Sequence, residues 1–409
     1  MIKQFINIKK LHGIQPADKK ILRGKELNIF PFLENAFIEV ENGLIRNFGL
    51  MKDLEINDSL DTVDCKNFEV IPAFCDSHTH LVYATTREEE FRDKINGLSY
   101  EDIASKGGGI LNSAAKLAAK PFDQLVEDAL ERLEEIKKQG TASVEIKSGY
   151  GLSVDSELKM LRVIQELKSK SGLNIKSTFL GAHAIPTMYK KNREEYIRLI
   201  IEEMLPEIAK EKLADYCDVF CEKGFYSNEE TRKIISWAAK YGLKAKIHAN
   251  QLSNTGAVQT AVECNALSVD HLEQMSDEEI NCLAKSNTIP TLLPSAAFFL
   301  RLPFPPARKM IEANLPVTIA TDFNPGSSPS GRMSFVISLA CSQMQMTPEE
   351  ALNACTLNGA AAMELSDITG SISIGKQANF ILLKNGHNIN HIPYHFGKDV
   401  IQKVVLKGN

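Results

Sequence analysis

Four histidines and one aspartate close strand-like segments of the sequence. His78 and His80 are separated by a single residue, and side chains two apart in extended chain point the same way, so both imidazoles can reach one metal ion. His248 closes the segment LKAKIH, His271 closes ALSVDH, and Asp322 closes LPVTIATD. Because the chain has only nine histidines, four of them at such positions indicate a shared site.

These residue types predict a hydrolytic metal centre. Three imidazoles and a carboxylate suit one Zn²⁺ or one iron ion, Fe²⁺ or Fe³⁺, and leave a coordination position for water. Such an ion lowers the pKa of bound water toward about 7. Asp322 is placed to bind the ion or to hold a proton of the attacking water, and His271 to polarise a carbonyl or bind an oxyanion. The alternatives are surface histidines at 78 and 80, and core imidazoles bonded to the backbone at 248 and 271.

The middle of the chain alternates between short β-branched runs and amphipathic segments of helical length. This alternation is typical of βαβ units around a parallel sheet. About eight strands favour a TIM (β/α)₈ barrel, whose active site forms at the carboxyl ends of the strands; a doubly wound sheet is the alternative. The predicted strands are FEVIPAF, ASVEIK, IKSTFLG, CDVFC, LKAKIH, ALSVD, NTIPTLL and LPVTIA.

Both ends of the chain read as short strands with turns. Asn42-Gly43 interrupts the segment FIEVENGLIRNFG and predicts a tight hairpin. ANFILLK and DVIQKVVLKG near the carboxyl end have the same character. We therefore predict a small β-sandwich domain built from residues 1–70 and 367–409, and a barrel hydrolase domain over residues 71–366.

Composition excludes several classes of protein. The 409 residues are 44% hydrophobic and 24% charged, as in ordinary globular domains. Lys+Arg number 47 and Asp+Glu 52, and the net charge of −5 argues against nucleic acid as a partner. The longest apolar run, 289–300, is too short to span a membrane, and the first residues lack a secretory signal, so we expect a cytoplasmic protein. The eight cysteines are interpreted as buried thiols.

Longer motifs cover about residues 72–365. They are CDSHTHLVYATTREEEF, GGGI, EIKSGYGL, TFLGAHAIP, IHANQLSNTGA, DHLE, TLLPSAAFFL, PPAR, ATDFNPGSSP and MTPEEALNACTLNGA. With these motifs the sequence resembles the amidohydrolase superfamily and, within it, the imidazolonepropionase family. The resemblance implies a mononuclear zinc or iron site on a TIM barrel, and hydrolysis of 4-imidazolone-5-propanoate to N-formimidoyl-L-glutamate in histidine degradation. An aminohydrolase of the same superfamily, acting on a nucleobase-like ring, is the alternative.

The resemblance also implies roles for the residues at matching positions. It assigns the metal ligands to His78, His80, His248 and Asp322, and the catalytic roles to Asp322, His271 and His183. It assigns contacts with the small-molecule substrate to Arg87, Tyr150, His183, Gln251, Asn324, Gly326 and Ser327.

Residue chemistry supports the assignment of Arg87. A guanidinium offers the propionate carboxylate a bidentate partner, and Arg87 follows the histidine pair closely enough to reach the same opening. The alternative is a surface arginine paired with Glu88 or Glu89. For Tyr150 and His183 the alternatives are a plain loop tyrosine and a capped loop histidine.

The sequence departs from the family pattern at three places. Ala73 and Asn250 stand where the family has Gly and Asp, and no arginine follows the triple glycine at 107–109. We interpret that triple glycine as part of a loop that moves over the site. Lys223, which would be needed for a binuclear centre, lies beyond a strand end, so we expect one metal ion per subunit.

Two further groups of residues have a structural interpretation. His387, His391 and His395 are interpreted as surface histidines of the small domain. The apolar stretch 290–300 is interpreted as barrel core, with a subunit contact of a homodimer as the alternative.

Overall fold

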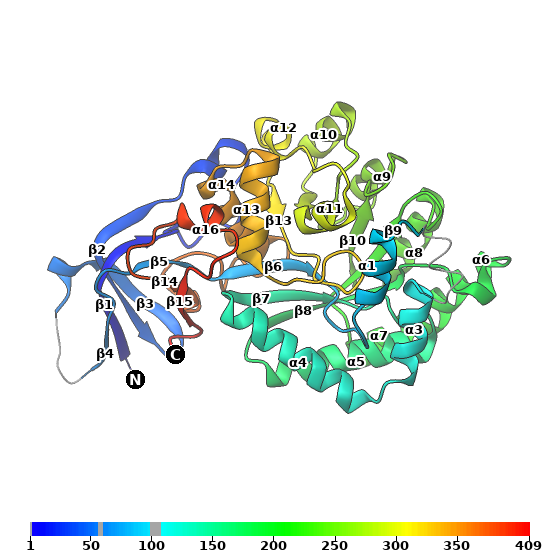
Figure 1. Cartoon of the computed structure of the whole chain (residues 1–409), viewed down its shortest axis with the longest axis horizontal. Coiled ribbons are helices and arrows are strands. Elements are labelled where there is room, and N and C mark those ends of the chain that lie inside the picture. Colours follow the sequence, from blue (N-terminus) through cyan, green and yellow to red (C-terminus); the bar gives the residue numbers. More distant parts are fainter. Residues whose placement is uncertain (1, 56–59, 99–107) are drawn as a thin grey trace.

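A barrel of eight parallel strands forms the larger part of the molecule (Figure 1). The computed structural model describes residues 2–55, 60–98 and 108–409, so Gly107 of the predicted mobile loop lies outside the described residues. Strands pair in chain order, and a bridge between Thr79 and Phe323 joins the first strand to the segment after the last. The barrel strands are β6 (Phe74–Thr79), β7 (Thr141–Lys147), β8 (Asn174–Ala182), β9 (Tyr216–Cys221), β10 (Lys244–Ala249), β11 (Ser268–His271), β12 (Ile289–Leu292) and β13 (Thr318–Ile319).

Helices cover the outside of the barrel because they carry one apolar face each. In α4 (Phe122–Lys138) the buried residues Leu125, Ala129 and Leu133 recur every four positions and pack into the barrel core. The helix is capped by Gln139, and Gly140 follows with a positive φ of 101°. The other helices are α1 (Glu88–Ile95), α3 (Ile110–Ala119), α5 (Val154–Lys170), α6 (Arg193–Leu199), α7 (Leu205–Glu211), α8 (Asn228–Lys240), α9 (Ala257–Glu263), α10 (Asp277–Ala284), α11 (Pro294–Leu300), α12 (Ala307–Glu312), α13 (Met333–Met344), α14 (Pro348–Cys355), α15 (Leu357–Ala361) and α16 (His391–Tyr394).

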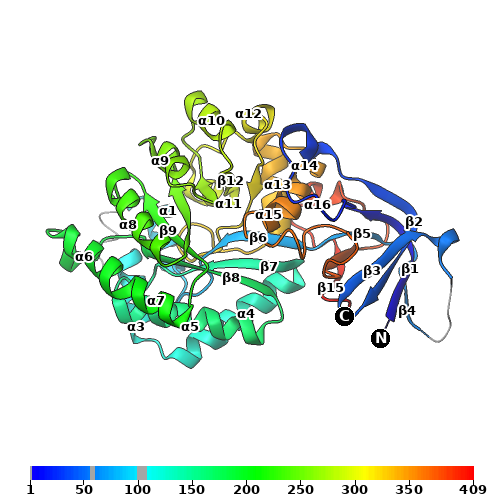
Figure 2. The same cartoon turned by 180° about the vertical axis from the view of Figure 1, so that it is seen from behind.

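The two ends of the chain meet in a second sheet beside the barrel (Figure 2). Asn42 and Gly43 have positive φ angles of 53° and 81°, as the predicted hairpin requires. The predicted TIM barrel with a small sheet domain from both termini is confirmed. The strands of this sheet are β1 (Ile2–His12), β2 (Phe32–Glu41), β3 (Leu44–Leu50), β4 (Asp61–Asp64), β5 (Glu69–Pro72), β14 (Phe380–Leu383) and β15 (Ile401–Val405).

One predicted strand is divided between the two sheets. The sequence predicts that FEVIPAF, residues 68–74, is the first barrel strand, but Glu69–Pro72 form β5 and pair with β1 and β14 of the terminal sheet. The barrel strand β6 begins at Phe74 and contains His78 itself. Both strands are buried along their whole length, so the apolar pattern continues from one into the other. The pattern therefore marks the strands but not the change of sheet.

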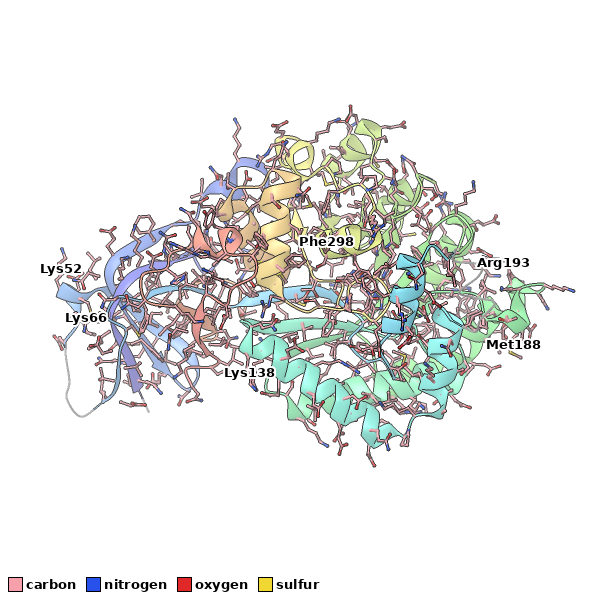
Figure 3. All side chains as sticks on the ribbon, in the orientation of Figure 1. Lys52, Lys66, Lys138, Met188, Arg193 and Phe298 are labelled. Atoms are coloured by element: carbon pink, nitrogen blue, oxygen red, sulfur yellow. The ribbon has the colours of Figure 1, made fainter. Side chains whose placement is uncertain are left out.

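The apolar stretch 290–300 is divided between β12 and α11. Leu292, Leu293 and Ala297 are buried, in agreement with the core interpretation, whereas Phe298 is 54% exposed (Figure 3). All eight cysteines are free thiols. Within the described ranges, no helix has the length and apolar character that a membrane span needs.

Replacing Gly140 by alanine is expected to destabilise the junction between the barrel and the terminal sheet. Gly140 has φ of +101°, and a Cβ there would lie 2.6 Å from Ile381 Cδ1 and 2.9 Å from Phe74 Cε2. Backbone strain of about 1 kcal/mol and overpacking of about 1–3 kcal/mol should lower the free energy of unfolding by roughly 2–4 kcal/mol in a denaturant titration.

Gly242→Ala is the matched control for this prediction. Gly242 has φ of +81°, but no atom lies within 4 Å of the position of its Cβ. This variant should lose only about 1 kcal/mol. Equal losses in the two variants would contradict the packing argument.

Candidate metal centre and substrate pocket

Five side chains from distant parts of the sequence meet at the carboxyl ends of the barrel strands. His78 lies in β6 and His80 directly after it, His248 lies in β10, His271 ends β11, and Asp322 follows β13. His80 Nε2 lies 3.3 Å from His78 Nε2 and 3.4 Å from His248 Nε2. Asp322 Oδ1 lies 3.5 Å from His78 Nε2 and 3.6 Å from His80 Nε2. The structure therefore brings together the residues that the sequence singled out, and all of them are buried.

The facing atoms of this cluster fit a metal ion. Unprotonated imidazole nitrogens and an ionised carboxylate are all acceptors, so in a buried site their lone pairs repel one another unless a cation lies between them. Histidine nitrogen and carboxylate oxygen are ligands that zinc and iron accept. Ring nitrogens of His78, His248 and His271 also lie within 4.8 Å of one another, so His271 borders the same space.

Two buried carboxylates orient the imidazoles. Asp270 Oδ2 lies 2.7 Å from His78 Nδ1, and Asp218 Oδ2 lies 2.9 Å from His248 Nδ1. An ionised carboxylate only accepts hydrogen bonds, so Asp270 keeps the proton of His78 on Nδ1 and leaves its Nε2 free for a metal, while Asp218 positions His248 by accepting from its backbone N at 3.2 Å. Burial lowers the pKa of His78 well below its usual value, which favours the neutral, ligating form.

A lysine lies beneath these two carboxylates. Lys147 Nζ is 2.6 Å from Glu145 Oε1, 2.8 Å from Asp218 Oδ2 and 3.4 Å from Asp270 Oδ2. Lys246 also pairs with Glu145, and all five side chains are fully buried. Burial alone would lower the pKa of Lys147, but the surrounding carboxylates outweigh that effect and raise it. Lys147 therefore stays charged and holds the two orienting carboxylates in place.

The ends of the barrel strands fix Asp322 against the histidine pair. Asp322 N donates to His78 O at 3.0 Å, and His80 N donates to Phe323 O at 2.9 Å. The φ angles of Asp322 and His271 are 54° and 89°, values that are strained for residues other than glycine. Strain of this kind collects at functional sites, where the surrounding structure enforces it.

A model of the amidohydrolase family matches residues 70–409. The chain belongs to the amidohydrolase family. It is 51% identical over 408 residues to a Flavobacterium johnsoniae protein named imidazolonepropionase, and the match covers 100% of this chain and 99% of that protein. A protein of the same name from Clostridium tetani is 43% identical over 389 residues, covering 94% and 93% of the two chains. Within the amidohydrolases, the chain thus groups with the imidazolonepropionases.

Solved structures share the fold of this amidohydrolase at low sequence identity. A variant of triazine hydrolase matches with a TM-score of 0.76 at 15% identity, covering 100% of this chain and 94% of that one. Guanine deaminase from C. acetobutylicum matches with a TM-score of 0.71 at 17% identity, covering 100% and 99%. At these identities the likeness concerns the fold.

Four residues predicted to contact substrate lie close to one another in this amidohydrolase. The guanidinium carbon of Arg87 lies 5.8 Å from the ring centre of Tyr150, whose Oη lies 3.5 Å from Asn324 Oδ1. A Cβ on Gly326 would lie 2.6 Å from Arg87 Nη1. Arg87 Nη2 is buried without a hydrogen-bond partner among the described residues. A carboxylate ligand would satisfy that donor.

The loop after β13 connects these residues to the metal centre. Asn324 Oδ1 accepts hydrogen bonds from Gly326 N at 2.7 Å and Ser327 N at 2.8 Å. Ser327 Oγ in turn donates to Asp322 Oδ2 at 3.1 Å. The predicted residues Asn324, Gly326 and Ser327 therefore form one turn against the metal-site carboxylate.

His183 and Gln251 complete the set of predicted substrate residues. The His183 ring stacks on His80 with centroids 5.3 Å apart, and its Nδ1 donates to Gly149 O at 3.0 Å. Burial lowers the pKa of His183 to about 3, so its Nε2 is a neutral acceptor. Gln251 begins a loop held by Glu222, which sequence analysis missed: Glu222 Oε2 accepts from Leu252 N at 3.0 Å.

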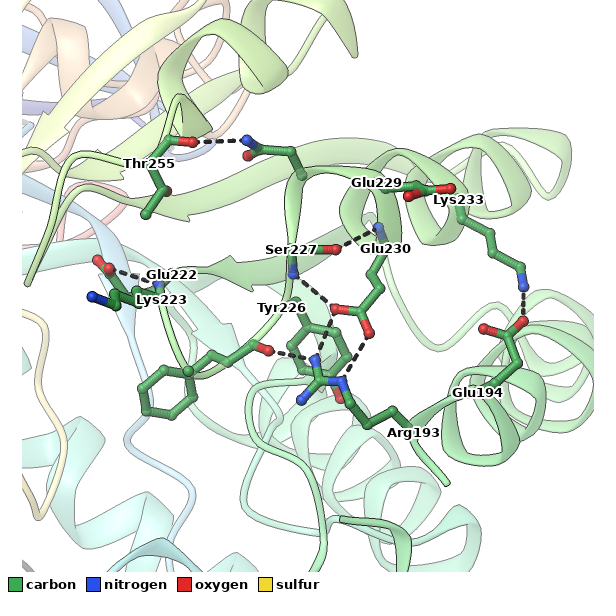
Figure 4. Close-up of a pocket in the computed structure, with 13 residues that line it drawn as sticks. Arg193, Glu194, Glu222, Lys223, Tyr226, Ser227, Glu229, Glu230, Lys233 and Thr255 are labelled. Atoms are coloured by element: carbon green, nitrogen blue, oxygen red, sulfur yellow. Dashed lines mark hydrogen bonds and ion pairs between the residues drawn. The ribbon is translucent and has the colours of Figure 1, made fainter. Parts of the chain in front are cut away.

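A hollow of about 830 Å³ lies beside β9, and none of the predicted metal or substrate residues lines it (Figure 4). An ion pair of 2.7 Å between Arg193 and Glu230 crosses it. The rings of Phe220 and Phe225, with centroids 4.4 Å apart, lie between the hollow and the metal-site histidines. Lys223 lines this hollow, so the lysine considered for a binuclear centre is directed to a different space.

Asp270→Asn is expected to weaken metal binding about 10–100-fold, because an amide no longer fixes the His78 proton on Nδ1. The measurement is metal retention against a graded series of chelator concentrations. Asp277→Asn, at an exposed position in α10, is the control. The orienting role of Asp270 fails if both variants retain metal as the unmodified protein does.

Proposed function

We propose that this chain hydrolyses 4-imidazolone-5-propanoate to N-formimidoyl-L-glutamate in histidine degradation. The observation that carries the proposal is the convergence of three imidazole Nε2 atoms and Asp322 Oδ1 in a chain that matches the Flavobacterium imidazolonepropionase over its whole length. Deaminases share the fold only at low identity, such as 17% for guanine deaminase, so they support the rival activity less well.

His78, His80, His248 and Asp322 would hold the metal, which we propose to be a single Zn²⁺ or iron ion per chain. The donor set accepts either element, and availability decides between them. When bound, the ion supplies Lewis acidity that activates water near neutral pH. An intermediate of amino-acid breakdown as substrate is consistent with activity in the cytoplasm.

Asp322 is the residue that we propose to move the proton. Burial raises the pKa of its carboxyl, which suits a group that takes a proton from the attacking water. The water oxygen bonds to the ring carbonyl carbon, the ring C–N bond breaks, and Asp322 passes the proton to the leaving nitrogen. The ring thereby opens and a new carboxylate forms.

His271 is suited to bind the oxygen on which charge develops. Burial opposes protonation of His271, but the carboxylates of Glu273 and Asp322 outweigh it and raise the pKa of the imidazole. The Nδ1 atom lies 3.3 Å from Glu273 Oε1, which leaves Nε2 to face the pocket. A protonated Nε2 can donate a hydrogen bond to the oxyanion.

Arg87, Tyr150 and the turn at Asn324 would bind the substrate. Nη2 of Arg87, which has no hydrogen-bond partner among the described residues, suits the propionate carboxylate, and the buried Tyr150 ring lies beside the guanidinium. Gly326 is required at its position because a side chain there would displace Arg87. The polar groups thus fix the two ends of a small cyclic amide, its tail at Arg87 and its carbonyl at the metal centre.

The direct test is to supply freshly prepared imidazolonepropionate to the purified protein and to follow formation of formimidoylglutamate. Product should form with the metal-loaded protein, stop after chelation and resume when Zn²⁺ or Fe²⁺ is returned. A metal-loaded protein that binds substrate but releases ammonia instead of opening the ring would refute the proposal in favour of a deaminase.

Arg87→Ala should lower kcat/KM about 100-fold, because a charge-assisted hydrogen bond of up to about 3 kcal/mol to the propionate is lost. Most of the loss should lie in KM, while the metal content stays unchanged. Arg92→Ala, an exposed arginine of the same helix, is the control and should retain normal kinetics. If Arg87→Ala also had normal kinetics, the proposed role of Arg87 in binding the substrate would be wrong.

A further inference from the structure

Three histidines outside the active site lie together around α16. His387, His391 and His395 are spaced by four residues, and the chain brings their rings into mutual contact. The ring centroids are 5.0 Å apart for His387 and His391, 5.2 Å for His391 and His395, and 5.7 Å for His387 and His395. All three side chains are partly exposed to solvent. The sequence interpretation of separate surface histidines does not account for this grouping.

The spacing of these rings matches that of the metal-site histidines. Among His78, His80 and His248 the ring centroids are 4.6, 5.2 and 5.5 Å apart. Rings that share one tetrahedral ion, with metal–nitrogen distances of about 2.0–2.1 Å, are expected to have centroids roughly 5 Å apart. The surface rings are therefore already at a separation that one ion can bridge.

Local hydrogen bonds prepare two of the three rings for metal binding. His387 Nδ1 lies 3.3 Å from the carbonyl oxygen of Asn385 and can only donate to it, which leaves Nε2 with its lone pair free. His391 Nδ1 accepts from Asn388 N at 3.0 Å and lies 2.9 Å from Asn388 Oδ1, so Asn388 occupies Nδ1 and Nε2 is the nitrogen left to face the other rings. Histidine ligands commonly donate from their second ring nitrogen to an oxygen, as His387 does.

We propose that His387, His391 and His395 form a second, surface binding site for a divalent transition-metal ion such as Zn²⁺ or Ni²⁺. Imidazole is a good ligand for both ions, and the remaining coordination positions are open to water. Within the described part of the chain, only active-site residues already gather their ligand atoms within 4.8 Å. To bind one ion, the surface rings would have to turn about the Cβ–Cγ bond, a torsion that is broad for histidine.

The site is separate from catalysis. α16 packs on α13, on the side of the barrel that faces the terminal sheet, and the orange and red ribbons of Figure 1 show this contact. The other six histidines are His12, which pairs with Glu69 in the terminal sheet, and the five of the active site with its pocket. An ion at α16 would connect the two ends of the segment 387–395 and restrain it.

The test is a metal count on the full-length protein with its active site already loaded. The protein is equilibrated with micromolar Ni²⁺, and both nickel and the resident metal are measured by mass spectrometry. We expect two metal ions per chain in total for the unmodified protein and one for His391→Ala, with at least a tenfold loss of Ni²⁺ affinity. Tyr394→Phe, in the same helix turn, is the control and should still bind two.

Further measurements distinguish Ni²⁺ at the surface histidines from Ni²⁺ at the active site or between two copies of the chain. His391→Ala should keep normal turnover, and a His248→Ala protein should still bind Ni²⁺ at the surface. The proposal is overturned if the unmodified protein binds one ion only, or if His391→Ala binds two. It is also overturned if half a Ni²⁺ ion binds per chain and the protein then sediments as a dimer. In that case the histidines of two copies would share one ion.

Discussion

The candidate site holds several hydrogen-bond acceptors face to face in a buried space. Three imidazole nitrogens and a carboxylate oxygen approach one another to 3.3–3.6 Å, where only a cation makes the arrangement favourable. The barrel can impose this geometry because the ligands are fixed by strand pairing rather than by their own contacts. Asp322 illustrates the point, since a backbone hydrogen bond to His78 holds it there in a strained conformation.

A layer of buried charges lies beneath the histidines and also favours a cation at the candidate site. Two lysines face three carboxylates, so the layer carries a formal charge of 2 − 3 = −1, which complements a cation above it. Removing Lys147 would leave the charges of Asp218 and Asp270 buried without a lysine to compensate them, which is costly. Lys147 therefore holds the two carboxylates in place, and Asp270 in turn keeps the proton of His78 on Nδ1.

Sequence patterns predicted which side chains converge better than they predicted the charged layer beneath those side chains. His78, His248 and Asp322 stand at strand ends, where a barrel places its active site, so their role follows from position and residue type. Lys147 ends β7 and Asp270 is next to last in β11, so strand position alone does not separate them from the histidines, and their signal is a charge in a strand that is buried along its whole length. That signal shows that a charge is buried but not which carboxylate it meets, because the partners are 71 and 123 residues away from Lys147. The change from the terminal sheet at β5 to the barrel at β6 could not be predicted either, because the apolar pattern continues through both strands.

The proposed metal ligands and the proposed substrate residues come from different parts of the barrel, namely its strands and the segments that follow them. The ligands lie in or directly beside paired strands, whereas Arg87, Tyr150, His183 and Asn324 lie in segments that follow four different strands. Loops change without disturbing strand pairing, so a barrel can keep one hydrolytic centre while the residues around it select another ring. We therefore propose that specificity lies at Arg87, where a buried donor has no hydrogen-bond partner among the described residues, rather than at the metal.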